Sequence, residues 1–208
     1  MIVRTKVCGI TRAEDALAAV HHGANAVGFV FWKQSERYVT PAKAREIAAQ
    51  LPPFVVAVGV YVDPDPEWVK ETSSIARLHL LQFHGNEPPD FCEQFFLPYI
   101  KAVRVRAGID LIQYATRHGG ARGLLLDTYV KGEPGGTGSV FDWTLIPQGL
   151  SLPVILSGGL RPDNVMEAIR QIRPWAVDVS SGVETGKGIK DAEKIAAFMR
   201  GVRASENL

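Results

Sequence analysis

This sequence has few cysteines, no long apolar run and no marked excess of either charge. Only Cys8 and Cys92 occur among 208 residues, which is too few for a disulfide framework in a chain of this size. No apolar run approaches the ~18 residues that span a bilayer, and Arg4 and Lys6 interrupt the N-terminal run, unlike a signal peptide. We therefore expect a cytoplasmic protein with two free thiols and no membrane partner.

Charge is almost balanced. The chain has 23 Lys and Arg against 22 Asp and Glu, a formal net charge of +1, and its basic residues are scattered, so no nucleic-acid partner is expected. Linkers rich in Ser or Pro, composition shifts and low-complexity tracts are absent from the sequence. These features predict a single domain over residues 1–208.

What the sequence does contain is a regular series of eight short apolar runs. Their starting positions are separated by 24, 28, 24, 22, 23, 30 and 23 residues. The runs are rich in Val, Ile, Leu and Phe without strict alternation, which is typical of strands buried on both faces of a parallel sheet. They are Ile2–Cys8, Ala26–Phe31, Phe54–Tyr61, Leu78–Phe83, Ile100–Val105, Gly123–Thr128, Pro153–Ser157 and Ala176–Ser181.

The runs are separated by segments in which apolar residues recur at the spacing of a helix. Thr11 is expected to cap the first, with Glu14 three residues later, and Thr40-Pro41 begins the second. Eight strands alternating with seven or eight helices predict an α/β protein with a parallel (β/α)8 barrel, and the near-constant spacing disfavours an open doubly wound sheet. The helical segments are Thr11–His22, Pro41–Gln50, Pro66–Ser74, Pro88–Phe96, Ile109–His118, Pro162–Ile172 and Lys190–Val202, with one short turn near Asp142–Ile146.

Polar residues gather where the runs end. Parallel barrels carry their active sites at the carboxyl ends of the strands, and Cys8, His84, Asp127 and Asp178 lie at or beside such ends. Gly158-Gly159 and Ser180-Ser181 follow the seventh and eighth runs, where many barrels bind a phosphate. Tight turns are the alternative for these glycines and serines, and the occurrence of both loops at the expected places favours phosphate binding.

Cys8 and Asp127 are the candidate chemical pair. A thiol acts as a base only as the thiolate, which a nearby positive charge such as Lys6 favours. A thiolate and a carboxylic acid across a barrel mouth suit proton transfer on a sugar phosphate, although Asp127 taken alone is equally well explained as a turn residue. Cys92, between aromatic residues, is expected to lie in the core. A cluster of metal ligands is missing from the sequence, so no metal is expected and a metal-dependent epimerase is disfavoured.

The glycine-rich segment at residues 135–138 lacks the Lys-Ser/Thr of a P-loop, and we expect a mobile loop there. Several longer motifs remain, namely KVCGIT at 6–11, GFVF with S-x-RYV at 28–39, VGVYV at 58–62, QFHGNE at 82–87, LLLDT at 124–128, GGTG-x-x-FDW at 136–143, LSGGL-x-P-x-NV at 156–165 and VDVSSGVE at 177–184. Together, in this order and at this spacing, they resemble the phosphoribosylanthranilate isomerase family of tryptophan biosynthesis over nearly the whole chain. Glu36 stands where the family usually has proline, and Phe83 where it usually has leucine.

The resemblance implies a cofactor-free Amadori rearrangement of N-(5-phosphoribosyl)anthranilate to 1-(2-carboxyphenylamino)-1-deoxyribulose 5-phosphate. By analogy with the family, Asp127 is the general acid that protonates the ribose ring oxygen, and Cys8 is the general base that removes the C2′ proton. Arg37 then pairs with the anthranilate carboxylate, unless the neighbouring Glu36 weakens or redirects it. His84 and Asp178 contact the sugar or position the substrate, and the phosphate is held by Gly158, Gly159, Ser180 and Ser181.

Two alternatives stay open at this point. One is another phosphate-binding barrel, such as a sugar-phosphate isomerase or an indole-glycerol-phosphate-type lyase. The other is a barrel that binds a phosphorylated ligand without converting it, but such a binder needs neither Cys8 nor Asp127. In each case the partner is a small phosphorylated molecule, and the sequence fits a monomer or a homodimer equally well.

Overall fold

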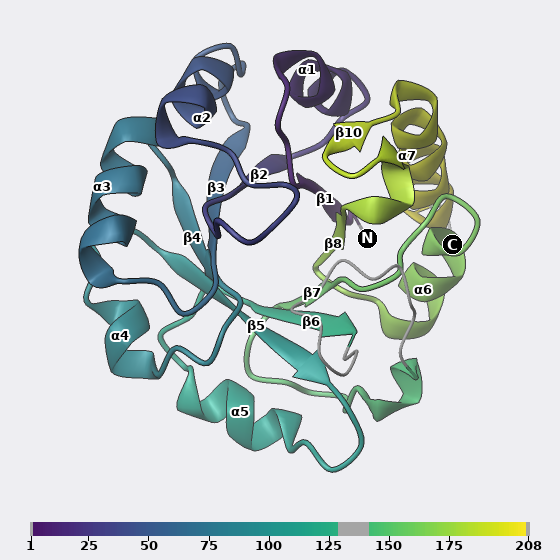
Figure 1. Cartoon of the computed structure of the whole chain (residues 1–208). Helices are drawn as coiled ribbons and strands as arrows, with labels where there is room; N and C mark the ends of the chain where they lie inside the picture. The colour runs from purple at the N-terminus through teal and green to yellow at the C-terminus, as the bar shows by residue number, and fades with distance from the viewer. Residues whose placement is uncertain (1, 129–141, 207–208) are drawn as a thin grey trace.

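Strand β1 (Arg4–Cys8) pairs in parallel with both β2 (Ala26–Val30) and β8 (Ala176–Val179), so the sheet closes on itself (Figure 1). The computed structural model describes residues 2–128 and 142–206, and within them the strands pair in order from β1 to β8. The predicted α/β (β/α)8 barrel is confirmed, and the open sheet is excluded. The other barrel strands are β3 (Val56–Tyr61), β4 (Leu80–Phe83), β5 (Tyr99–Val105), β6 (Leu124–Thr128) and β7 (Val154–Leu156).

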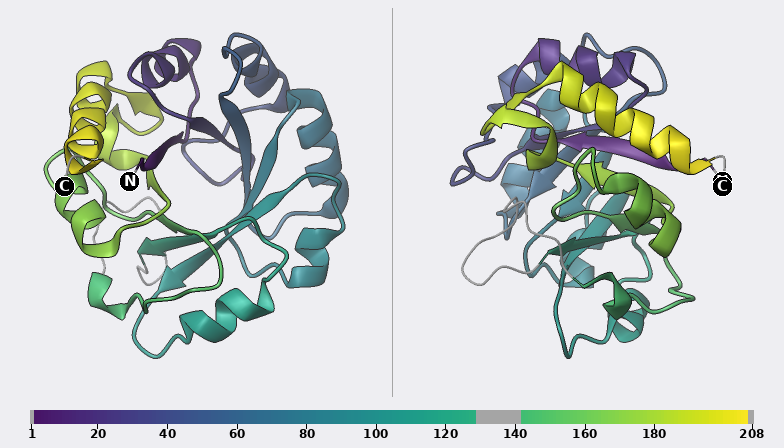
Figure 2. Two further views of the ribbon diagram at one scale, coloured as in Figure 1. Left: turned by 180° about the vertical axis from the view of Figure 1, so that it is seen from behind. Right: turned by 90° about the vertical axis from the view of Figure 1, so that its right-hand side faces the viewer.

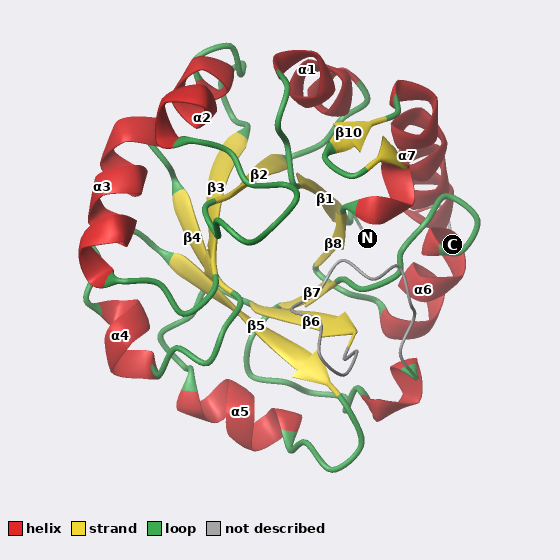
Figure 3. Cartoon of the chain, in the orientation of Figure 1, coloured by secondary structure: helices red, strands yellow, loops and turns green. Residues whose placement is uncertain are grey.

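Helices surround the strands on the outside of the barrel (Figure 3). The last of them packs against both its predecessor and the first, so the ring of helices closes where the sheet closes (Figure 2). Among the described residues, no helix is both long and apolar enough to cross a membrane. The helices are α1 (Ala13–His21), α2 (Pro41–Ala48), α3 (Pro66–Ala76), α4 (Pro89–Glu93), α5 (Leu111–Arg117), α6 (Val165–Ile172) and α7 (Ala192–Glu206).

The two predicted helix caps have different outcomes. Thr40 caps α2 as predicted, because its side chain accepts a hydrogen bond from the Lys43 amide and Pro41 begins the helix. Thr11 does not cap α1, which has Arg12 at that position with no side-chain cap. The Thr11 hydroxyl instead donates to the carbonyl of Gly188 at 2.5 Å. The prediction was wrong: the Thr11 side chain is directed at a distant segment, and α1 begins without a side-chain cap.

That distant segment is a small hairpin between β8 and α7. A 3-10 turn, η2 (Ser181–Val183), leads into β9 (Glu184–Gly186), which pairs antiparallel with β10 (Ile189–Lys190). The sequence predicted that Lys190 begins the last helix, whereas it ends the hairpin and is buried. The short turn predicted after the sixth strand is present as η1 (Trp143–Leu145). The mobile loop predicted at residues 135–138 lies outside the described residues.

The main core lies between the outer face of the sheet and the helices, where apolar side chains leave water at a gain of roughly 25 cal/mol per Å². In β6, Leu124 and Leu126 belong to this outer core, whereas Leu125 packs inside the barrel with Ile100 and Ala102. Cys92 is fully buried in the outer core, as predicted. The alternation of side chains along each strand therefore decides which polar residues face the barrel interior.

Candidate active site

Because side chains alternate along each strand, four of them point into the barrel near its carboxyl end, from β1, β6 and β8. In β6 the side chain two residues after the inward-facing Leu125 is that of Asp127. In β8 both neighbours of Asp178 face the outer core, so Asp178 faces inward. In β1 the outward Val7 separates Lys6 from Cys8, which puts both of these on the inner face.

Cys8, Asp127 and Asp178 meet the loops in one pocket at the carboxyl end of the barrel. Its walls are partly apolar, with Trp32 and Leu160 among them, as is usual for a small-molecule site. The structure brings every site residue predicted from the sequence into this pocket. They are Cys8, Arg37, His84, Asp127, Gly158, Gly159, Asp178, Ser180 and Ser181.

Asp127 is held at both carboxylate oxygens. Its Oδ1 accepts the Thr128 amide at 2.9 Å, and its Oδ2 lies 2.9 Å from Nε2 of His84. On the other side of the imidazole, Nε2 of Gln82 lies 3.0 Å from Nδ1 of His84. Because an amide nitrogen only donates, this arrangement makes Nδ1 an acceptor and leaves the ring proton on Nε2, aimed at the Asp127 carboxylate.

The side-chain oxygen of Gln82 is buried and has no hydrogen-bond partner in the structure. Flipping the Gln82 amide would place its oxygen against Nδ1 of His84, and the ring proton would then be on Nδ1. Nε2 of His84 would then accept a hydrogen bond from the O–H group of the acid form of Asp127. The chain Gln82–His84–Asp127 thus supports Asp127 in either charge state, which a general acid requires.

Cys8 lies beside a buried ion pair. Nζ of Lys6 and Oδ1 of Asp178 are 2.9 Å apart, and their side chains are 7% and 5% exposed. Burial lowers the pKa of Lys6, but Asp178 and Cys8 together raise it above the ordinary lysine value. Burial raises the pKa of the Cys8 thiol, and Lys6 only partly offsets that increase. The positive charge expected beside Cys8 is present, yet burial outweighs it, so the pKa of the thiol lies above its ordinary value.

Arg37 reaches the pocket from the loop between β2 and α2. A bridge between Val30 and Tyr38 fixes this loop. The guanidinium is held by Glu184, with Nε donating to Oε1 at 2.9 Å and Nη2 to Oε2 at 2.8 Å. Two of its five N–H groups are used in this fork, so its other edge can still bind a carboxylate. The neighbouring Glu36 does not redirect it, because Glu36 pairs with the exposed Lys187.

The two candidate phosphate loops follow β7 and β8. Gly158 and Gly159 have φ of 81° and 66°, the left-handed region that favours glycine. A Cβ atom on Gly158 would lie 2.5 Å from the amide nitrogen of Thr128 and 3.0 Å from Oδ1 of Asp127. Gly158 therefore allows the loop after β7 to approach the strand end that carries Asp127, a role beyond the one predicted from the sequence.

Reasoning from the sequence missed Glu184 and Lys190. Glu184 stands in the motif VDVSSGVE, but its contact with Arg37 joins residues 147 positions apart. Lys190 was taken for a helix residue, and its ammonium group donates to Glu184 and to Ser180. Among the described residues, no group of three or more His, Cys, Asp and Glu side chains is arranged to hold a metal ion.

Comparisons with known proteins agree on one family. The family model described as N-(5'phosphoribosyl)anthranilate (PRA) isomerase matches residues 5–201. The N-(5'-phosphoribosyl)anthranilate isomerase of Nitrosospira multiformis is 71% identical over 208 residues, which is 100% of each chain. The enzyme of the same name from Pseudomonas fluorescens is 58% identical over 203 residues, covering 98% of this chain and 97% of its own.

Solved structures lead to the same family. The crystal structure of phosphoribosyl anthranilate isomerase from Thermotoga maritima has a TM-score of 0.89 and 43% identity, covering 97% of this chain and 99% of its own. A second solved phosphoribosyl anthranilate isomerase is in complex with reduced 1-(o-carboxyphenylamino)-1-deoxyribulose 5-phosphate. It has a TM-score of 0.82 and 40% identity, with coverage of 97% and 99%.

Proposed function

The chain belongs to the N-(5'-phosphoribosyl)anthranilate isomerase family, and we propose that the pocket at the carboxyl end of its barrel carries out the acid and base steps of that reaction. The protein is an isomerase of tryptophan biosynthesis that converts N-(5'-phosphoribosyl)anthranilate by an Amadori rearrangement. Membership of this family sets aside the other phosphate-binding barrels and the binder without turnover. The whole reaction takes place within a single domain, residues 1–208.

Asp127 is the general acid. It protonates the ribose ring oxygen, the bond from that oxygen to C1′ breaks, and the nitrogen lone pair forms an iminium with C1′. Two hydrogen bonds fix the Asp127 carboxyl group, from the Thr128 amide and at His84, so the acid is oriented before the substrate arrives. His84 acts on the reaction through Asp127 as well as facing the pocket.

Cys8 is the general base. The iminium withdraws electrons from the neighbouring C2′, which makes its proton acidic enough for a thiolate to remove. The electron pair of the broken C–H bond forms the C1′–C2′ double bond of an enolamine, and the iminium nitrogen regains its lone pair. The enolamine then tautomerises to the 2-ketone. Lys6 lies beside Cys8 and stabilises the thiolate against the effect of burial.

The two charged ends of the substrate are held by different loops. Arg37 binds the anthranilate carboxylate with the edge of its guanidinium that Glu184 leaves unused. Gly158, Gly159, Ser180 and Ser181 bind the phosphate, and Asp178 contacts the sugar from the floor of the pocket. The observation that carries this assignment is that Cys8 and Asp127, on strands 119 positions apart, line one pocket together with both loops.

The assay is the loss of anthranilate-type fluorescence when the purified protein meets freshly generated N-(5'-phosphoribosyl)anthranilate in the presence of a metal chelator. Fast catalytic loss of fluorescence is the expected result, and no turnover above the background rate would refute the proposed function. The two cysteines are free and buried, which suits a reducing compartment. We propose that the enzyme acts in the cytoplasm, as a monomer or a homodimer, on a small phosphorylated substrate.

A further inference from the structure

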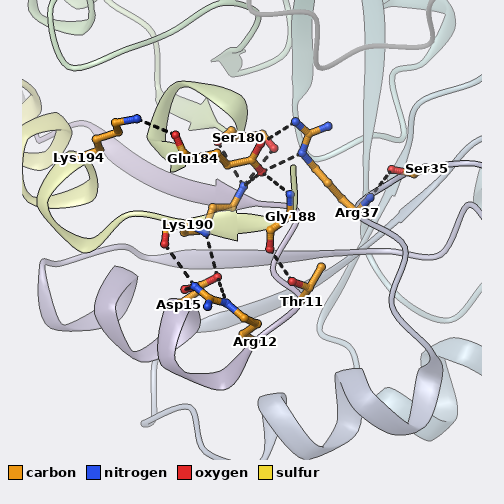
Figure 4. Close-up of polar contacts among 10 residues, drawn as sticks. All are labelled: Thr11, Arg12, Asp15, Ser35, Arg37, Ser180, Glu184, Gly188, Lys190 and Lys194. Carbon is orange, nitrogen blue, oxygen red and sulfur yellow. Dashed lines mark hydrogen bonds and ion pairs between the residues drawn. The ribbon is translucent and has the colours of Figure 1, made fainter. Parts of the chain in front are cut away.

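The predicted binding sites for the carboxylate and the phosphate are joined by buried charges that have no part in the reaction itself. We propose that Glu184 and Lys190 are positioning residues, which hold Arg37 and Ser180 as one unit and so fix the distance between the two charged ends of the substrate. The proposal rests on the proposed function of Arg37 and Ser180. Figure 4 shows the contacts on which it is built.

Lys190 is placed to orient Ser180. Its side chain is 0% exposed, and the ammonium group donates to the backbone oxygen of Ser180 at 3.2 Å and to its Oγ at 3.3 Å. The third contact is with Oε1 of Glu184 at 2.6 Å. An ammonium group has three N–H donors, so each has a partner and the group is fixed in one orientation.

Glu184 is shared between the two cations. Its side chain is 6% exposed, and its carboxylate accepts both bonds of the Arg37 fork as well as the bond from Lys190. A single carboxylate thus lies between the residue that meets the substrate carboxylate and the residue that orients Ser180. Burial lowers the pKa of Lys190, and its ion pair with Glu184 opposes this change.

Arg37 and Ser180 also pack against the same backbone position. Gly9 has φ of 76°, and a Cβ atom there would lie 2.5 Å from Cδ of Arg37 and 3.2 Å from Oγ of Ser180. Gly9 follows the catalytic Cys8 directly in the chain. The positions of both binding groups are therefore set relative to the strand end that carries the general base.

The hairpin that carries Glu184 and Lys190 is attached to the start of α1. The Lys190 amide donates to Oδ2 of Asp15 at 3.0 Å, and the Lys190 carbonyl accepts from Arg12 at 3.4 Å. Thr11 donates to the carbonyl of Gly188 in the same hairpin. With its amide, carbonyl and ammonium groups all bonded, Lys190 cannot move without disturbing the start of α1 (Figure 4).

The charges explain why the unit favours this substrate. Two cations and one carboxylate leave a net positive charge of one beside a pocket that receives two anionic groups. Since breaking a buried pair leaves an uncompensated charge, loss of either Glu184 or Lys190 should displace both binding groups together. A purely structural pair would lower the melting temperature without changing the binding of either end.

The test uses Glu184→Gln, Lys190→Met and the double variant, with Lys194→Met as the matched control. Lys194 also contacts Glu184, but only at its backbone oxygen and from the exposed surface. For each protein one measures kcat, KM and the inhibition constants of anthranilate and of inorganic phosphate. Glu184→Gln nearly preserves side-chain volume, so it decides the question alone if Lys190→Met does not fold.

We expect each single variant to raise KM and both inhibition constants by about tenfold or more, because each variant loses a charge-assisted hydrogen bond. The change in kcat should be smaller. The double variant should lose less than the product of the single losses, because both belong to one unit. Inhibition constants within twofold of the parent, or the same losses in Lys194→Met, would overturn the proposal. If the parent itself does not turn over, it is the proposed function that fails.

Discussion

Replacing Lys6 with methionine perturbs stability and catalysis in ways that can be separated. In the parent, Lys6 lies 2.9 Å from Asp178 and beside Cys8, and all three side chains are buried. Lys6→Met leaves the Asp178 carboxylate without its counter-ion. It also removes the one group that most lowers the pKa of Cys8. We therefore expect a less stable enzyme whose activity requires a higher pH.

The size of the stability loss follows from burial. Removing one partner of a pair this buried costs about 3–5 kcal/mol, and in a domain of this length each kcal/mol lowers the melting temperature by about 2–4 °C. The expected decrease is therefore roughly 6–20 °C at neutral pH. Burial already raises the pKa of Asp178, so the penalty exists above that pKa. It shrinks as the pH falls and Asp178 takes up a proton.

The double variant Lys6→Met/Asp178→Asn separates the two effects. It contains no unpaired buried charge, so most of the lost stability should return. The lowering effect of Lys6 on the pKa of Cys8 is larger than the raising effect of Asp178, so the activity should still require a higher pH than in the parent. Thermal unfolding and the pH profile of kcat/KM measure these outcomes. A parent-like pH profile in Lys6→Met would refute the role given to Lys6.

Three further predictions concern single groups in the pocket. Because burial raises the pKa of Cys8, kcat/KM of the parent should increase from neutral to mildly alkaline pH, and a flat profile would contradict a thiolate base. His84→Ala leaves Oδ2 of Asp127 without its hydrogen-bond partner. It should lower kcat about tenfold or more with little change in KM. An unchanged kcat in steady-state assays would show that His84 takes no part in the reaction. Gly158→Ala places a methyl group against Thr128 and Asp127 at positive φ, and should cost about 1–3 kcal/mol in denaturant unfolding together with most of kcat. Parent-like stability would show that this loop can move aside.

The fold and the residues that line the pocket could be predicted from the sequence, because both follow from local patterns. Unbroken apolar runs at regular intervals define parallel strands, and the rule that a barrel binds at the carboxyl ends of its strands then gathers Cys8, His84, Asp127 and Asp178. The period of two supplies their inward direction. None of these steps requires knowledge of which side chain contacts which.

The partners of these residues could not be predicted, since they depend on contacts between distant loops. Thr11 has the local sequence of a helix cap, but its hydroxyl bonds to Gly188, 177 positions away. Lys190 precedes a strongly helical segment, yet it lies in a hairpin. There its amide bonds to the side chain of Asp15 and its carbonyl to the side chain of Arg12, at the start of α1. The raised pKa of Cys8 could not be predicted either, because the sequence places Lys6 beside it but does not give the degree of burial that outweighs Lys6.

The division of the reaction between Cys8 and Asp127 is tested most directly by single-turnover fluorescence, with the parent, Cys8→Ala and Asp127→Asn each in excess over N-(5'-phosphoribosyl)anthranilate. Near-UV circular dichroism and the inhibition constant of inorganic phosphate establish that each variant is folded and has its phosphate site intact. We predict that both variants bind phosphate as the parent does and lose nearly all turnover, since a general acid or base contributes about 10²–10⁴-fold. Turnover at the parent rate in either variant would contradict the role assigned to that residue.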